Sequence, residues 1–146
     1  MRHHLILRVV TKLLVGYIIL FAFYVQFHGD YSPGGGFQAG VIMAVAFVLY
    51  GVVFGLTKVQ KVFPAWLVHK IVALGLLIYA GTGVASLLLG YNFLDYGAFN
   101  PHHPSHGQHW GILVIELGVG VTVTGVMVAI YYAFAARPPR LSDEDW

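Results

Sequence analysis

The sequence predicts an all-α integral membrane protein, a bundle of four transmembrane helices with both termini in the cytoplasm. Of its 146 residues, 58% are hydrophobic and only 10% are charged, whereas a soluble domain carries roughly 25% charged residues. The apolar residues gather in blocks that can form helices of about 20 residues, the length that crosses a bilayer. Helices are favoured over a β-barrel because backbone amides in lipid must be satisfied within the segment, and the blocks do not alternate as barrel strands do.

Four apolar blocks make up a single membrane domain. The expected spans are residues 5–27, 37–57, 71–90 and 111–136, and residues 137–146 form a short cytoplasmic tail. Arg2, Arg8 and Lys12, followed by the apolar run of residues 13–27, could pass for a secretory signal. No small-residue cleavage site comes after it, so we expect a retained first span.

The basic residues set the expected orientation. All eight lie at the N-terminus, between the second and third spans, or at the C-terminus: Arg2, Arg8, Lys12, Lys58, Lys61, Lys70, Arg137 and Arg140. The other two connections contain no lysine or arginine. Because cytoplasmic connections are enriched in these residues, the pattern predicts a multi-pass protein of the cytoplasmic membrane with both termini inside.

Composition also excludes several kinds of function. The chain has no cysteine, which rules out disulfides, iron–sulfur clusters and thiolate metal sites. Its formal net charge is only +2 and its basic residues are dispersed, so nothing indicates binding to nucleic acid. We therefore expect neither a cofactor nor a nucleic-acid partner.

Small residues recur at four-residue intervals in the later spans, as in Gly36, Gly40 and Ala44. This spacing allows helix backbones to approach closely in a membrane, where packing drives association. Each pair is explained by packing within the bundle. Four helices cannot bury all of these faces against each other, so some are expected to meet other subunits.

Glu116 is the only acidic residue inside a predicted span. It follows Trp110 by six residues, roughly 9 Å along a helix, and a charged side chain near the bilayer centre costs about 2.5–3.5 kcal/mol. Gly120 and Thr124 follow at helical spacing as a small polar stripe. The carboxylate is therefore expected to face protein or a water-filled cavity.

Two interpretations of Glu116 stay open. It is either a protonated structural acid bonded to a neighbouring backbone, or a group that handles protons or cations or pairs with a lysine of an adjacent subunit. A transport path across a bilayer needs a series of exchanging groups, and one carboxylate cannot form it. We therefore expect the chain to be one part of a larger complex.

A glycine-rich connection leads into the second span and contains Pro33, Gly34, Gly35 and Gly36. Glycine permits positive φ and the close approach of another backbone, and free amides at a helix start attract negative charge. The nearby His28 and Asp30 could bind a proton or a cation. With no second convergent ligand in the sequence, a tight connection that docks on a neighbouring subunit is the favoured interpretation.

The third connection carries four clustered histidines, His102, His103, His106 and His109. Clustered imidazoles bind zinc or copper. However, Pro101, Pro104 and Gly107 are expected to prevent the regular helix that would align three of these rings, and the nearest acidic residue is Asp95. Structural histidines are thus favoured over a dedicated metal site.

The segment from His28 to Gly40 resembles a known family. It contains the Pro-Gly-Gly-Gly-Phe signature of the MnhB family, the MnhB subunits of Mrp-type multisubunit sodium/proton antiporters. The signature is made here of Pro33, Gly34, Gly35, Gly36 and Phe37, with Gly40 following. The resemblance extends from Leu5 to Ala136 and includes the four-span layout and an acidic residue in the last span. The family more often has aspartate where this chain has Glu116.

The resemblance implies an accessory membrane subunit, not an enzyme, of a complex that exchanges cytoplasmic sodium for external protons. Such a subunit would support assembly and could line part of an ion path through Glu116. Its partners would be the other antiporter subunits, sodium ions, protons and the lipid bilayer. Two alternatives stay open: the equivalent subunit of a membrane-bound hydrogenase-like respiratory complex, and a free-standing membrane protein that binds metal through its histidines.

Overall fold

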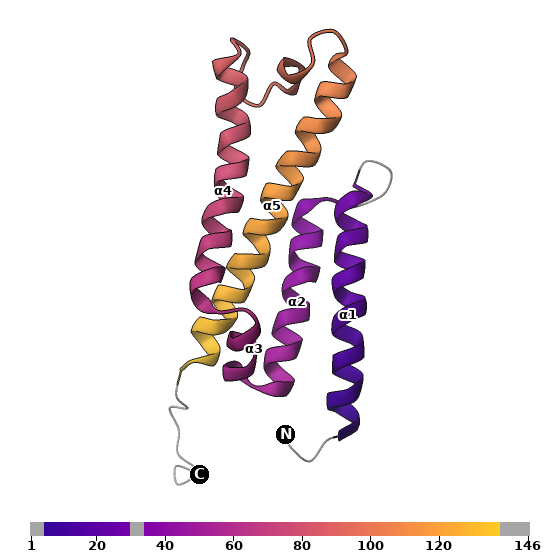
Figure 1. Cartoon of the computed structure of the whole chain (residues 1–146), viewed down its shortest axis with the longest axis vertical. Coiled ribbons are helices and arrows are strands. Elements are labelled where there is room, and N and C mark those ends of the chain that lie inside the picture. Colours follow the sequence, from indigo (N-terminus) through magenta and orange to yellow (C-terminus); the bar gives the residue numbers. More distant parts are fainter. Residues whose placement is uncertain (1–4, 30–33, 138–146) are drawn as a thin grey trace.

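The computed structural model describes residues 5–29 and 34–137, and this part of the chain contains helices and no strand. The four long helices are α1 (Leu5–Phe27), α2 (Gly36–Phe54), α4 (Ala65–Leu88) and α5 (Pro104–Ala135). The short α3 (Leu56–Val62) and the 3-10 helix η1 (Tyr96–Phe99) lie in the connections (Figure 1). Each long helix is long and apolar enough to cross a membrane. The predicted all-α fold with four candidate spans is confirmed.

Helix α5 holds the bundle together. It packs against α4 on one side and α2 on the other, and α1 packs mainly on α2 (Figure 1). Helix α1 begins and α5 ends at the same end of the molecule, where α3 and the start of α4 also lie. This end, called here the basic end, carries every lysine and arginine that the structure describes: Arg8, Lys12, Lys58, Lys61, Lys70 and Arg137.

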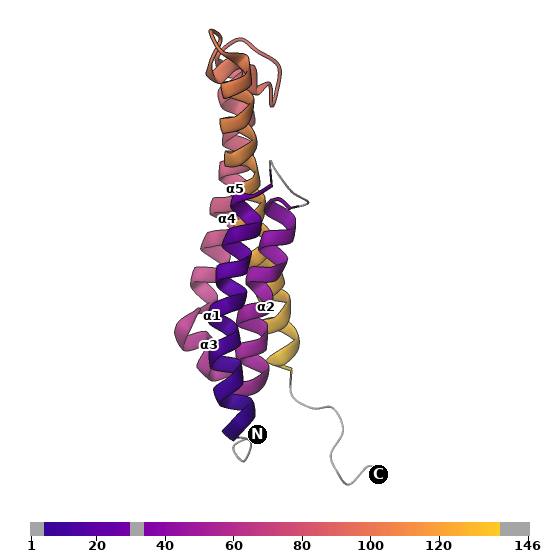
Figure 2. The ribbon, with the colours of Figure 1, turned by 90° about the vertical axis from the view of Figure 1, so that its right-hand side faces the viewer.

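Helices α4 and α5 form a hairpin that extends well beyond α1 and α2 at the opposite end (Figure 2). Helix α5 has 32 residues and is roughly 48 Å long at 1.5 Å per residue. Helix α2 has 19 and reaches only about 29 Å. The connection between α1 and α2 therefore meets α5 near its middle and not at its start.

Close backbone packing joins α4 to α5. A methyl group placed on Gly75 of α4 would lie 2.7 Å from the carbonyl oxygen of Gly118 and would collide with the hydroxyl of Thr122. The Thr122 hydroxyl donates a hydrogen bond of 2.8 Å to the same Gly118 carbonyl. Small residues thus allow the two helices to approach at the distance that favours association in lipid.

The basic end is closed by α3. Gly55 has a φ of +97°, which ends α2 at Phe54, three residues before the expected end of the second span. The following segment, expected as a basic connection, is instead mostly helical and buries Val59 completely. Val59 packs in a core cluster with Ala44, Val68, Val128 and Tyr132. The hydroxyl of Tyr132 donates a 2.6 Å hydrogen bond to the carbonyl of Phe63.

Both helices of the hairpin begin before the expected spans, α4 at the basic end and α5 at the opposite end. Helix α4 begins at Ala65 and α5 at Pro104, several residues before residues 71 and 111. The connection between them folds back onto the hairpin, with the Phe93 ring against Gly83 and Tyr96 against Gly107 and Gly111. Gly83 and Gly111 leave room for the two aromatic side chains, and Gly107 leaves room for the Tyr96 carbonyl, so the connection packs as part of the bundle.

Replacing Gly75 with leucine should destabilise the protein, because the new side chain would meet Gly118 and Thr122. Overpacking of this kind costs about 1–3 kcal/mol. The matched control is Gly81→Leu on the same helix, where a built methyl group meets nothing within 4 Å. Thermal unfolding of the purified protein in detergent is monitored by size-exclusion chromatography. The midpoint temperature of unfolding should be lower for Gly75→Leu alone. Equal midpoints would contradict the close α4–α5 contact.

Candidate functional site

Glu116 lies near the middle of α5, where the ends of α1 and α2 opposite the basic end meet that helix. Its side chain is half-buried, and it is the only acidic residue of the four long helices. From the sequence, Glu116 was expected near the start of the last span, six residues after Trp110. Because α5 begins at Pro104, about three helical turns precede Glu116. The carboxylate thus lies level with the connection between α1 and α2.

The glycines of that connection surround the carboxylate. A methyl group built on Gly29 would lie 2.9 Å from Oε2 of Glu116, and one built on Gly35 would lie 3.1 Å from Oε1. Gly35 has a φ of +129°, a conformation that residues with a side chain rarely adopt. The glycine-rich segment and the single carboxylate, which are far apart in the sequence, form one site.

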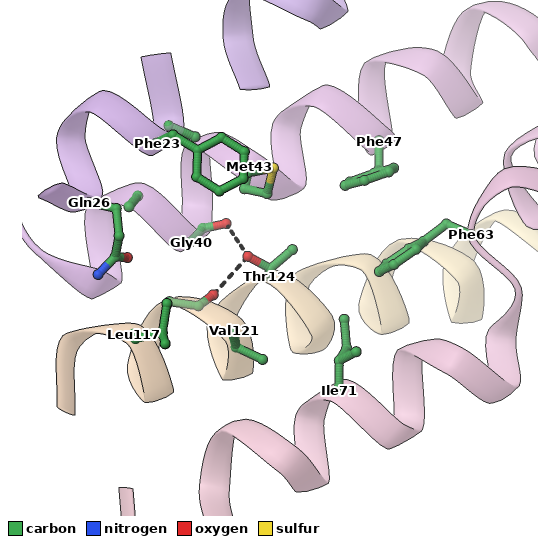
Figure 3. Close-up of a pocket in the computed structure, with 13 residues that line it drawn as sticks. Phe23, Gln26, Gly40, Met43, Phe47, Phe63, Ile71, Leu117, Val121 and Thr124 are labelled. Atoms are coloured by element: carbon green, nitrogen blue, oxygen red, sulfur yellow. Dashed lines mark hydrogen bonds between the residues drawn. The ribbon is translucent and has the colours of Figure 1, made fainter. Parts of the chain in front are cut away.

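The backbones of α2 and α5 touch directly beside this site. A methyl group on Gly36 would overlap the backbone carbonyl oxygen of Glu116, and one on Gly40 would lie 2.7 Å from the carbonyl oxygen of Gly120. The hydroxyl of Thr124 is 2.7 Å from the carbonyl oxygen of Gly120 and 3.2 Å from that of Gly40 (Figure 3). Gly36, Gly40, Gly120 and Thr124 form what is called here the α2–α5 interface.

Helix α1 contributes a polar group to the same region. Gln26 is only 9% exposed, and a methyl group on Gly120 would lie 2.6 Å from its Oε1 atom. The amide therefore reaches α5 one turn away from Glu116. Gln26 was not expected from the sequence, although a lone amide near the end of an apolar block was a signal that could have identified it.

An apolar cavity of about 290 Å³ adjoins the interface. It lies between α1, α2 and α5, and Ile71 of α4 and Phe63 close its other side (Figure 3). Gln26 and Thr124 are its polar residues. The cavity borders the α2–α5 interface on the side away from the glycine-rich connection.

The remaining residues of the glycine-rich segment have different surroundings. Gly34 packs on the end of α1, where a built methyl group would lie 3.0 Å from the carbonyl oxygen of Val25. Phe37 is 60% exposed. Asp30 and Pro33 lie outside the described residues.

His28 lies at the end of α1, next to Gly29. Its Nδ1 atom is 3.2 Å from the carbonyl oxygen of Tyr24, and its ring stacks on the Tyr24 ring with centroids 4.0 Å apart. These contacts hold the imidazole against α1. The next residue, Gly29, borders the Glu116 carboxylate. His28 is therefore adjacent in the sequence to a residue of the site.

Comparison with known protein families gives one match over most of the chain. A family described as "Domain related to MnhB subunit of Na+/H+ antiporter" matches residues 6–129. The chain belongs to the MnhB family. The resemblance found in the glycine-rich segment is thereby confirmed, and the family is one of transporter subunits and not of enzymes.

Three staphylococcal members of the MnhB family illustrate the similarity. A chain of Staphylococcus haemolyticus strain JCSC1435, named antiporter subunit mnhB2, is 36% identical over 132 residues, which are 89% of this chain and 93% of the relative. Chains of the same name from Staphylococcus epidermidis strain RP62A and Staphylococcus aureus strain Newman are each 35% identical over 127 residues. Those alignments cover 86% of this chain and 89% of each relative.

The four clustered histidines of this MnhB family member, His102, His103, His106 and His109, lie at the far end of the α4–α5 hairpin. The expectation that Pro104 and Gly107 prevent a regular helix is wrong, since α5 runs from Pro104 through both His106 and His109. Proline is tolerated at the first position of a helix because no amide hydrogen bond is needed there. Gly107 fits because the carbonyl of Tyr96 lies against it.

Helix α5 does not gather three of the described histidines into one cluster. The rings of His103 and His106 have centroids 5.9 Å apart, and His109 contacts Trp110. His102 precedes the helix and is exposed. Within residues 5–29 and 34–137, no three His, Cys, Asp or Glu side chains converge as metal ligands would. Along α5, His109 lies roughly 10 Å and His106 roughly 15 Å from Glu116.

Replacing Gly36 with alanine should destabilise this chain, because its methyl group would overlap the Glu116 carbonyl. The matched control is Gly16→Ala in α1, where the added methyl group meets nothing within 4 Å. We expect a lower unfolding midpoint for Gly36→Ala and an unchanged or higher one for Gly16→Ala, since alanine favours helix by up to about 1 kcal/mol over glycine. A Gly36→Ala protein as stable as the control would contradict the backbone contact.

Proposed function

We propose that this chain is an accessory membrane subunit of a multisubunit sodium/proton antiporter, and that Glu116 lines part of the ion path. The family description names a subunit of a Na+/H+ antiporter, and the staphylococcal relatives are named antiporter subunits. The observation that carries the proposal is the contact between the Glu116 carboxylate and the glycine backbone of the first connection.

The surroundings of Glu116 suit a group that binds a proton and a cation in turn. Glycine places backbone, and not bulky side chains, next to the carboxylate oxygens, so a small ion or a water molecule can approach them. Sodium sites in membrane transporters are commonly completed by carbonyl oxygens of non-helical backbone, and the first connection supplies such backbone. A carboxylate with one proton or one sodium ion is neutral either way, which makes the two ions competitors.

Other subunits must supply the rest of the path. The described part of the chain has two carboxylates, and that of Asp95 lies in the third connection, where it accepts a hydrogen bond from the Gly97 amide. Glu116 is therefore the one carboxylate within the four long helices. An ion that leaves it must pass to groups on neighbouring subunits.

A role in assembly is supported by the exposed apolar surface of α1. Helix α1 packs mainly on α2, and large side chains such as Leu5, Tyr17 and Phe27 are more than half exposed. Lipid or other transmembrane helices must cover them in a membrane. A subunit with one loosely covered helix is suited to packing between larger partners.

The two alternatives from the sequence are less well supported. The relatives carry antiporter names, which favours an antiporter over a hydrogenase-like complex. A metal-binding role for the histidines lacks a converging set of ligands in the described part of the chain.

We further propose that both termini lie in the cytoplasm. Helix α1 begins and α5 ends at the basic end, and cytoplasmic connections are enriched in lysine and arginine. The α4–α5 hairpin and its histidines would then project to the outside.

Replacing Glu116 with glutamine should lower sodium/proton exchange at least about tenfold, as expected when the only ion-exchanging group of a segment is removed. Exchange is measured in everted membrane vesicles as the sodium-dependent collapse of a pH gradient, and assembly by co-purification of the other subunits. Asp95→Asn is the control, since it also removes one carboxylate but outside the long helices. Near-normal exchange in a fully assembled Glu116→Gln complex would make Glu116 a structural residue.

The absence of native cysteine allows a direct test of orientation. Asn92→Cys places a thiol in the exposed third connection, and Ser142→Cys places one in the C-terminal tail. In intact cells, a membrane-impermeant maleimide should label only the Asn92→Cys protein. Labelling of Ser142→Cys alone would reverse the proposed orientation.

A further inference from the structure

Three cationic side chains from two helices converge on one aromatic ring at the basic end. Phe54, the last residue of α2, has the guanidinium of Arg8 at 5.3 Å from its ring centroid. The ammonium groups of Lys12 and Lys58 lie at 5.8 and 5.9 Å from the same centroid. Arg8 and Lys12 belong to α1 and Lys58 to α3. This group is called here the Phe54 cluster.

The arrangement concentrates like charges. A single cation is stabilised by an aromatic face. Two such one-to-one pairs lie at the basic end, Lys70 over Trp66 and Arg137 over Phe134. At Phe54 the three cations share one ring and so lie within about a screening length of each other, roughly 10 Å at 0.1 M salt. Their mutual repulsion is unfavourable unless an anion lies among them.

No carboxylate of the described residues can be the anion that lies among these three cations. Among residues 5–29 and 34–137 the acids are Asp95 and Glu116. Glu116 lies against Gly29 and Gly35 at the other end of α1 and α2, and Asp95 lies beyond α4 in the third connection. The charge of the Phe54 cluster is thus uncompensated within the part of the chain that the structure describes.

A hollow is present beside the cluster. Arg8 and Lys58 line a space of about 340 Å³ together with Phe54, Gly55 and Thr57. A molecule of liquid water occupies about 30 Å³, so a phosphate group and its hydration fit easily. An arginine fork, an ammonium group and a hydroxyl are the donors that bind phosphate oxygens.

The position of the hollow identifies the source of the phosphate. Arg8 is in the first turn of α1 and Phe54 ends α2, so both lie where membrane-spanning helices reach the headgroup layer. Basic pockets between transmembrane helices bind the headgroups of anionic lipids. We propose that Arg8, Lys12 and Lys58 form a binding site for the phosphate of an anionic phospholipid headgroup.

The test uses the assembled complex in phosphatidylcholine vesicles that contain photoactivatable phosphatidylglycerol, with photoactivatable phosphatidylcholine as the background. Crosslinking to this chain is measured after its separation on a gel. We expect the R8Q/K12Q/K58Q variant to lose phosphatidylglycerol labelling about tenfold, since each basic residue near anionic lipid contributes to binding. The control K61Q/K70Q/R137Q removes the same charge from the same end and should keep nearly all of its labelling.

Three results would overturn the proposal. Equal loss in the two triple variants would mean diffuse attraction to the membrane surface. Displacement of the label by inorganic phosphate, but not by chloride of equal ionic strength, would mean that the site takes free phosphate. Labelling that appears only after Asp143, Glu144 and Asp145 are neutralised would mean that the acidic tail of the chain fills the site.

A second pair of variants keeps the test decisive if the triple variant does not assemble. Lys58 and Lys61 lie one helical turn apart on α3 and are both exposed, so neither change should disturb packing. Lys58→Gln should lower the phosphatidylglycerol labelling and Lys61→Gln should not. Equal labelling of these two proteins would refute the site.

Discussion

The close approach of the α2 and α5 backbones is the constraint on which the rest of this structure depends. At Gly36 and Gly40 the two helices are so near that no side chain fits between them. Small residues provide this approach in lipid, where the hydrophobic effect does not drive helices together. The contact fixes the position along α5 at which α2 begins. It therefore also fixes where the connection between α1 and α2 crosses α5.

That position decides the surroundings of Glu116. If α2 began one turn higher along α5, the carboxylate would face the side of a helix. Instead it faces Gly29 and Gly35, which carry no side chains, and Gly35 has a φ of +129°. Irregular backbone at membrane depth persists only where protein buries it or where it lines a water-filled cavity, and both conditions favour an ion-handling site. The long α4–α5 hairpin extends past this level.

The two ends of the bundle divide the polar chemistry of the chain. The carboxylate and the four clustered histidines (His102, His103, His106 and His109) lie toward the hairpin end, and every described lysine and arginine lies at the basic end. This separation leaves the cations of the Phe54 cluster without an internal partner among the described residues. It also supports the orientation proposed above, because connections rich in lysine and arginine face the cytoplasm.

The sequence by itself determined the fold class, the number of candidate spans and the family, because these depend on local composition and on one contiguous motif. It also singled out Glu116, since a lone acid in an apolar block is visible without any knowledge of packing. It could not place the helix boundaries at Gly55 and Pro104, where backbone conformation and contacts with Tyr96 decide the outcome.

Only the tertiary structure brought Gly29, Gly35 and Glu116 into one site and added Gln26 to it. The same is true of Arg8, Lys12 and Lys58, which a sequence shows merely as dispersed charges. The physical reason is that both groupings join segments far apart in the chain, and their relative heights are set by how closely glycine lets neighbouring helices pack.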